Sequence, residues 1–144
     1  MRRKLALTVV ATFAVAGMAR AQVADPIAIR QAGQDLLSGD FSGIRAVVAA
    51  KGDLTKLEAP AKAMARWIRT FPSQFPPGSD KGETKALPAV WSDRAGFEKA
   101  ANALAEAADR LAAAAKAGNG EAVATEVKAV GDACTACHRT YRAR

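Results

Sequence analysis

The sequence contains few of the residues from which metal sites and disulfide frameworks are built. Its 144 residues include one histidine and two cysteines. A zinc site made only of cysteine and histidine needs four ligands, and two cysteines are too few for a disulfide framework. Aromatic residues are also scarce, at five Phe, two Trp and one Tyr, although half of the chain is hydrophobic. Much of that half is alanine, the strongest helix former, so the composition favours a single all-α domain.

The N-terminus has the three parts of a secretory signal peptide. Residues 1–4 carry three positive charges, an apolar run extends from Leu5 to Met18, and residues 19–21 form an Ala-x-Ala cleavage pattern. We predict a signal peptide over 1–21, cleaved after Ala21, and a mature domain over 22–144. The apolar run of about 14 residues is shorter than the roughly 20 of a membrane-spanning helix, which makes an uncleaved membrane anchor the less favoured alternative.

Removal of the signal peptide leaves a nearly balanced charge. Residues 1–21 hold four of the 21 basic residues and no acidic one, so 17 basic and 14 acidic residues remain, a net charge of +3. No basic run with interleaved aromatic residues is present. These features argue against a nucleic-acid partner and against a membrane contact after cleavage. We expect a soluble, exported protein in an oxidising compartment.

Apolar residues recur at alternating steps of three and four through the rest of the chain, which places them on one face of a helix. The clearest stripe is Phe97, Ala101, Leu104, Ala108, Leu111 and Ala115. We predict helices over 26–50, 54–71, 89–117 and 120–142, with Pro60 marking a kink or a later start of the second. Short links join the first two and the last two helices, and a Pro- and Gly-rich crossover loop separates the pairs. The pattern predicts an antiparallel up-down-up-down four-helix bundle.

The most informative motif is Cys134-Thr-Ala-Cys137-His138, the C-x-x-C-H pattern of haem c attachment. Cysteines three residues apart lie on one face of a helix, within reach of the two vinyl groups of one porphyrin, and the histidine is then the axial iron ligand. Two buried small hydrophobes, a dithiol redox site and a structural disulfide are the alternatives. Haem is favoured because the only histidine and both cysteines fall within five residues.

Three segments resemble the class II c-type cytochromes, the cytochrome c′ family. They are the C-terminal motif with Tyr141-Arg142 after it, the pair Arg30-Gln31, and the segment from Phe75 to Phe97. The resemblance covers essentially the whole mature chain. It implies a four-helix bundle with one covalent haem c near one end, a bacterial periplasmic location, and often a homodimer packed through the first two helices.

The residue that would face the iron opposite His138 is Gln34, by the resemblance, because it lies four positions after Arg30. It also falls on the inward heptad of the first helix, where a buried amide needs a partner, and Gly33 beside it leaves space. In the alternative, the helix is rotated and Gln34 meets water at the boundary. Met64 on the second stripe is the rival ligand, although such a methionine is more often a packing residue. Because an amide is a weak iron ligand, we predict a five-coordinate ferrous haem or one with a loosely held sixth ligand.

Further contacts to the haem follow from charge and from the resemblance. The resemblance implies that Arg30 and Gln31 meet the two propionates, and Thr84 in the crossover loop is a weaker candidate. Arg142 and Arg139 would flank the proximal side, or be solvated terminal charges.

Aromatic residues are expected around the same site. Trp91 and Phe97 would begin the third helix at the haem end and wall the pocket, although ordinary core packing predicts nearly the same position. Tyr141 lies on the stripe of the last helix and is expected in the core.

Three functions are compatible with the sequence. The first is single-electron transfer between periplasmic redox proteins, for which a weakly basic surface suits transient contact with acidic patches. The second is binding or buffering of diatomic gases, nitric oxide or carbon monoxide, at a five-coordinate haem. The third is a haem-free helical interaction module. We do not expect an enzyme, because the single histidine is already the axial ligand and none remains for distal acid–base chemistry.

Overall fold

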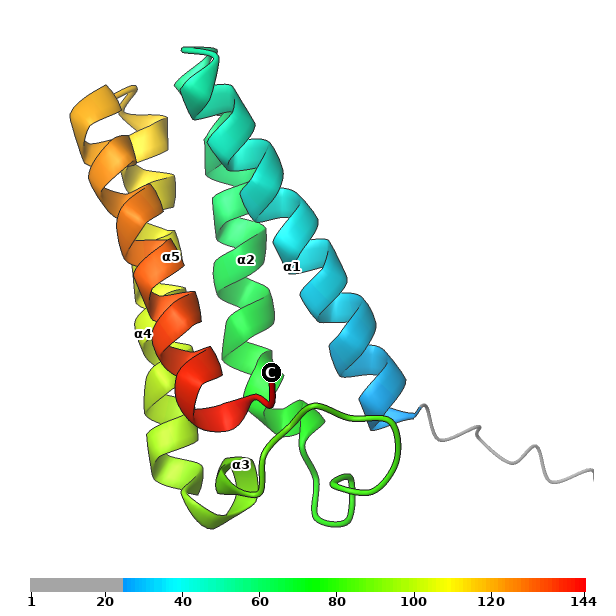
Figure 1. The fold of residues 1–144 in the computed structure, drawn as a ribbon. Coiled ribbons are helices and arrows are strands. Elements are labelled where there is room, and N and C mark those ends of the chain that lie inside the picture. The colour runs from blue at the N-terminus through cyan, green and yellow to red at the C-terminus, as the bar shows by residue number, and fades with distance from the viewer. Residues whose placement is uncertain (1–24) are drawn as a thin grey trace, which may run out of the picture.

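The computed structural model describes residues 25–144, so the predicted signal peptide lies outside the described residues. Four long helices form the body: α1 (Pro26–Ala49), α2 (Glu58–Thr70), α4 (Arg94–Lys116) and α5 (Gly120–Tyr141). They run alternately up and down, and α3 (Ala89–Ser92) is a short turn of helix before α4 (Figure 1). The predicted all-α, up-down-up-down four-helix bundle is confirmed.

The ends of the helices follow local sequence signals. The Asp25 side chain accepts a hydrogen bond from the Ile27 amide ahead of Pro26, and the Asn119 side chain accepts one from the Ala122 amide. Gly118 adopts φ +63°, the left-handed conformation that ends α4. These caps satisfy amide groups that the helices leave without partners.

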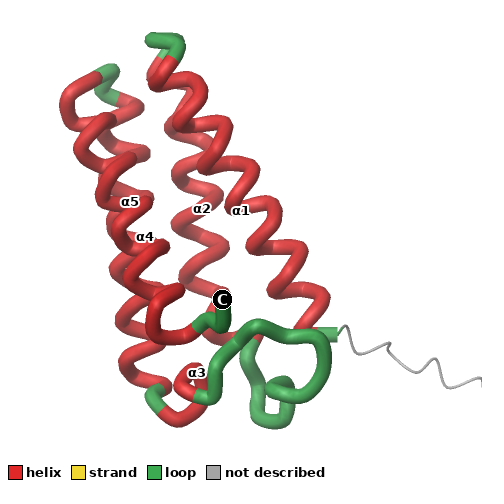
Figure 2. Tube along the Cα trace, viewed as in Figure 1, coloured by secondary structure: helices red, strands yellow, loops and turns green. Residues whose placement is uncertain are grey.

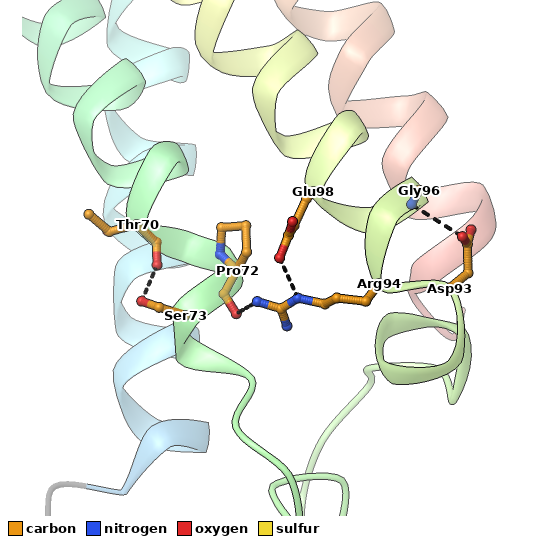
Figure 3. Close-up of polar contacts among 7 residues, drawn as sticks. All are labelled: Thr70, Pro72, Ser73, Asp93, Arg94, Gly96 and Glu98. Carbon is orange, nitrogen blue, oxygen red and sulfur yellow. Dashed lines mark hydrogen bonds and ion pairs between the residues drawn. The ribbon is translucent and has the colours of Figure 1, made fainter.

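Two predicted helices are interrupted. The segment expected as one helix from residue 54 begins as a 3₁₀ turn, Leu54–Leu57, and α2 starts at Glu58, so Pro60 lies in its first turn. The segment expected over 89–117 breaks at Asp93, whose φ of −118° and ψ of 59° are not helical. The Asp93 side chain instead caps α4 by accepting a hydrogen bond from the Gly96 amide (Figure 3).

The core lies mainly between α2, α4 and α5, and α1 packs mainly against α2. All six residues of the α4 stripe are buried: Phe97, Ala101, Leu104, Ala108, Leu111 and Ala115. A second cluster at the crossover-loop end contains Phe75, Val90, Phe97 and Tyr141. Within residues 25–144, no helix is both long enough and apolar enough to cross a membrane.

The crossover loop and the C-terminus meet at one end of the bundle (Figure 2). The Leu87 amide donates to the Tyr141 carbonyl at 2.9 Å, and the Ala143 amide donates to the Lys85 carbonyl at 2.8 Å. At the same end, Arg94 donates to Glu98 on its own helix and to the Pro72 carbonyl that follows α2 (Figure 3). The last turn of α5 is therefore fastened to the loop.

Candidate functional site

A cavity of about 1020 Å³ opens at this end of the bundle. Side chains of α1, α2, α4, α5 and the crossover loop line it. Pockets for cofactors and other small molecules usually measure about 300–1,000 Å³. The cavity is therefore large enough for a sizeable cofactor.

One wall of the cavity carries all three residues of the predicted attachment motif. Cys134, Cys137 and His138 lie in the last two turns of α5 and line the same cavity. Both cysteines are free and half-buried, and His138 is exposed. Two thiols one helical turn apart and an adjacent imidazole, facing a cavity of this size, fit a covalently bound haem c with His138 on its iron.

The environment of the thiols argues against the alternative of a dithiol redox site. Burial raises the pKa of Cys137 to about 11, with the neighbouring Cys134 adding to the shift, and burial raises the pKa of Cys134 as well. A dithiol redox site needs a low-pKa thiolate, usually at a helix N-terminus, whereas this pair lies near the C-terminal end of α5. The pair is also not simple core packing, because both side chains border the cavity.

The surroundings of His138 favour the neutral form of its imidazole. Burial lowers the pKa of His138, and the positive charge of Arg142 lowers it further. The neutral imidazole is the metal-binding form. Among residues 25–144, no group of three or more His, Cys, Asp or Glu side chains is placed to hold a bare metal ion.

The opposite wall is formed by α1 and α2. Gln34 is half-buried and lines the cavity, so it faces the cavity without being sealed inside it. No hydrogen bond of its side chain is found among the described residues. Met64 also lines the cavity, but it is only 1 % exposed and belongs to the main core cluster. The expected space beside Gly33 is absent, because the Trp67 indole fills it.

Arg30 is buried, and its partners in this structure come from the crossover loop. It donates to the Ser79 carbonyl and to Thr84 Oγ1, each at 2.8 Å, and also to Ser79 Oγ and the Gln74 carbonyl. Its guanidinium lies 4.5 Å from the centroid of the Phe75 ring. Arg30 therefore ties the loop to α1, a role that the sequence did not reveal.

The remaining predicted contacts divide into two groups. Gln31, Thr84, Phe97 and Arg142 line the cavity, and the Gln31 amide donates to the Glu83 carbonyl at 2.8 Å. Trp91, which we expected to wall the pocket, is not among the residues that line the cavity. Its indole packs behind Phe75, at 5.9 Å between centroids, and donates to the Pro76 carbonyl. Arg139 is not among the lining residues either.

Sequence reasoning missed the contact that fixes the end of α5. The Tyr141 hydroxyl donates to Asp93 Oδ2 at 2.8 Å, and its ring packs against Phe97 at 5.2 Å between centroids. Tyr141 is one helical turn after His138, so this contact anchors the turn that carries the predicted iron ligand. The heptad stripe predicted that Tyr141 is buried, but no sequence signal predicted its hydrogen-bond partner.

Comparison with known proteins agrees with this geometry. The sequence profile of the family described as Cytochrome C′ matches residues 25–142. Cytochrome c′ from Rubrivivax gelatinosus is 37 % identical over 121 residues, which cover 82 % of this chain and 94 % of that protein.

Two solved structures are informative. A nitric oxide complex of a cytochrome c′ variant from Alcaligenes xylosoxidans superposes with a TM-score of 0.75 at 29 % identity, covering 83 % of this chain and 94 % of that one. A cytochrome c′ with ligand-controlled dimer dissociation gives a TM-score of 0.77 at 31 % identity, covering 83 % and 95 %.

The family match spans nearly all of the described residues. Proteins of this family bind one covalent haem c, the cofactor that the C-x-x-C-H motif and the cavity both predict. The fold, the cavity and the attachment motif thus agree with the comparisons, and the chain belongs to the cytochrome c′ family of haem c proteins.

Proposed function

We propose that this chain is an exported mono-haem cytochrome whose haem is bound through Cys134 and Cys137, with His138 as the axial iron ligand. The observation that carries the proposal is the position of these three residues on one wall of a cofactor-sized cavity. Each thiol would add across one vinyl group, with sulfur bonded to one vinyl carbon and the thiol hydrogen transferred to the other. His138 would hold the iron through its neutral imidazole.

Once bound, the haem supplies reversible one-electron exchange and an iron coordination position that a diatomic gas can occupy. The chain supplies the surface for electron transfer. Exposed Arg45, Lys85 and Arg142 border the cavity, together with exposed Asp35 and Glu83. This mixed, mildly basic rim suits brief contact with acidic patches of periplasmic redox proteins. Electron transfer with no enzymatic step is therefore the first function.

Binding of nitric oxide or carbon monoxide is the second function, and the wall opposite His138 favours it. That wall offers Gln34, whose amide is a weak iron ligand, and Met64, which is packed in the core. The relative from Alcaligenes xylosoxidans was solved with nitric oxide. We infer that Gln34 leaves the distal side of the haem open to a small gas, and that Arg30, Gln31 and Thr84 lie toward the propionates.

Covalent attachment of the haem is tested by exporting the protein from cells that contain a haem-maturation system. We expect the wild-type protein to retain one haem after denaturation, with a mass equal to residues 22–144 plus haem. The variant with Cys134→Ser and Cys137→Ser should lose the covalent haem, while the matched variant Thr135→Ser, between the two cysteines, should keep it. A wild-type mass equal to the bare polypeptide would overturn the proposal.

The ligand test compares ferrous spectra with and without carbon monoxide. A shifted Soret band indicates an open or loosely held sixth position and supports gas binding. An unchanged band indicates a firmly held sixth ligand and leaves electron transfer as the function. The mass measurement above also tests periplasmic export and cleavage after Ala21.

We also propose that two copies associate through α1. Leu36 on this helix is 73 % exposed, and Gly39 and Gly43 on the same helix have open space around them. A related cytochrome c′ forms a dimer whose dissociation is controlled by ligand. Sedimentation of the holoprotein at several concentrations tests this association.

A further inference from the structure

Near the cavity, α1 and α2 meet through a contact between a glycine and a tryptophan. A Cβ atom placed on Gly33 would lie 1.9 Å from Trp67 Cζ2, 2.4 Å from Cε2 and 2.5 Å from Cη2. These distances are far below van der Waals contact, so the indole occupies the volume of a side chain at position 33. Only glycine allows α1 to stand as close to α2 as it does.

The tryptophan is half-buried and packs at the edge of the core. Its ring packs against the main core cluster and lies 6.0 Å from Phe71, which itself lines the cavity. Its Nε1 is buried without a hydrogen-bond partner in residues 25–144, although the side chain as a whole is half-buried. The indole is therefore a spacer between α1 and the core on the α2 side.

The helix on the other side of the contact is held less firmly. Figure 1 shows α1 diverging from α2 toward the crossover loop, and α1 packs mainly on α2. Arg30, Gln34 and Leu37 surround Gly33 in sequence and all line the cavity, on the wall across from α5. The distance between Gly33 and Trp67 therefore sets how far these side chains reach into the cavity.

We propose that Gly33 and Trp67 act together as a positioning pair that sets the space available to a diatomic ligand on the distal side of the haem. This inference rests on the gas-binding function proposed above. The pair touches neither haem nor ligand; it acts through the place of α1 and the side chain of Gln34. A larger residue at 33 moves α1 outward and opens the distal space, and a smaller residue at 67 lets α1 settle inward and closes it.

The test measures the association rate of carbon monoxide with the ferrous holoprotein. In Gly33→Ala the helix must move by about 1.5 Å to restore ordinary contact at 3.4 Å. Because displacements near 1 Å change rates strongly, we expect association to be faster by about tenfold. The matched control is Gly120→Ala at the start of α5, where a Cβ would meet only Leu54 Cδ1 at 3.6 Å, an ordinary contact.

Complementary variants separate positioning from a general effect on stability. In Gly33→Ala combined with Trp67→Phe, the six-membered ring edge that meets position 33 is removed, and the rate should return to the wild-type value. Trp67→Phe alone should bind carbon monoxide more slowly than wild type. An unchanged rate in Gly33→Ala overturns the inference. If Gly33→Ala yields no holoprotein, an unchanged rate in Trp67→Phe overturns it.

The wild-type response to carbon monoxide separates failure of the positioning role from failure of the proposed gas-binding function. If the wild-type ferrous spectrum does not respond to carbon monoxide, the gas-binding function and this inference fall together. If the wild type responds and the variants at 33 and 67 behave as wild type, only the positioning role falls.

Discussion

The two walls of the cavity are held in different ways. The α5 wall, which carries Cys134, Cys137 and His138, packs along α4 and is anchored at its last turn by Tyr141 and by backbone bonds to the crossover loop. The α1 wall, which carries Gln34, packs mainly on α2 and is tied to the loop through Arg30. A covalent cofactor benefits from a rigid wall because its axial ligand must stay aligned with the iron. The α1 wall, which is held by fewer contacts, is the wall whose position can change access to the iron.

The largest expected effect comes from removing the hydrogen bonds of Arg30, which join the α1 wall to the crossover loop. Arg30→Ala removes four hydrogen bonds, two of them to buried Ser79. Loss of bonds from a charged, buried donor should lower the free energy of unfolding by about 3 kcal/mol. Urea denaturation of the holoprotein measures this loss of unfolding free energy. The control Arg94→Ala removes an exposed ion pair and a loop bond; an equal loss in both variants would contradict a special role for Arg30.

A smaller effect is expected at the anchor of the rigid wall. Tyr141→Phe keeps the ring against Phe97 but loses the bond to Asp93, which should lower the free energy of unfolding by about 1 kcal/mol. Because this turn carries His138, the reduction potential should shift as well, whereas Thr125→Val, far along α5, should leave it unchanged. Equal potentials in Tyr141→Phe and the wild type would show that the anchor does not reach the iron ligand.

The same anchor gives a prediction on pH. The hydrogen bond to Asp93, followed by burial, raises the pKa of Tyr141 to about 12, above about 10 for an unfolded tyrosine. The folded state therefore holds the proton more tightly, and this stabilisation is complete below pH 10 and is lost as pH rises through about 12. The difference in unfolding free energy between wild type and Tyr141→Phe should shrink over that interval. A constant difference would mean that ionisation of Tyr141 is not linked to folding.

On the α1 wall, Gln34→Leu should change ligand binding with little change in stability. The side chain is half-buried at the cavity, so we expect the free energy of unfolding to stay within about 0.5 kcal/mol. Carbon monoxide titration of the ferrous protein should report a changed affinity, because an amide facing the distal space is replaced by an apolar group. Leu57→Met, in the core away from the cavity, serves as the control. An affinity equal to wild type would mean that Gln34 does not face the ligand.

The smallest effect on the folded chain is expected on the outer face of α1. Leu36→Glu replaces an exposed side chain, so monomer stability should change by less than about 0.5 kcal/mol. Sedimentation should nevertheless show weaker self-association, because the apolar contact becomes two facing charges. If the wild type and Leu36→Glu sediment alike at all concentrations, α1 is not the dimer interface.

Much of the fold and the attachment wall could be predicted because the signals are local. Heptad spacing predicted four antiparallel helices, and the predicted starts at residues 26 and 120 agree with the structure. The break at Asp93 was missed because it depends on a side chain capping α4 from within an apparently continuous stripe. The packing of Trp91 against Phe75 was also not predicted, because it depends on the path of the crossover loop.

The sequence by itself determined the helix pattern and the cofactor chemistry, since both depend on residues a few positions apart on one helix. Tertiary structure alone decided what stands across the cavity from His138. The Trp67 indole fills the space beside Gly33, the crossover loop takes the hydrogen bonds of Arg30, and Asp93 receives the Tyr141 hydroxyl. Each of these contacts joins residues more than 30 positions apart, and no local periodicity encodes which of them will meet.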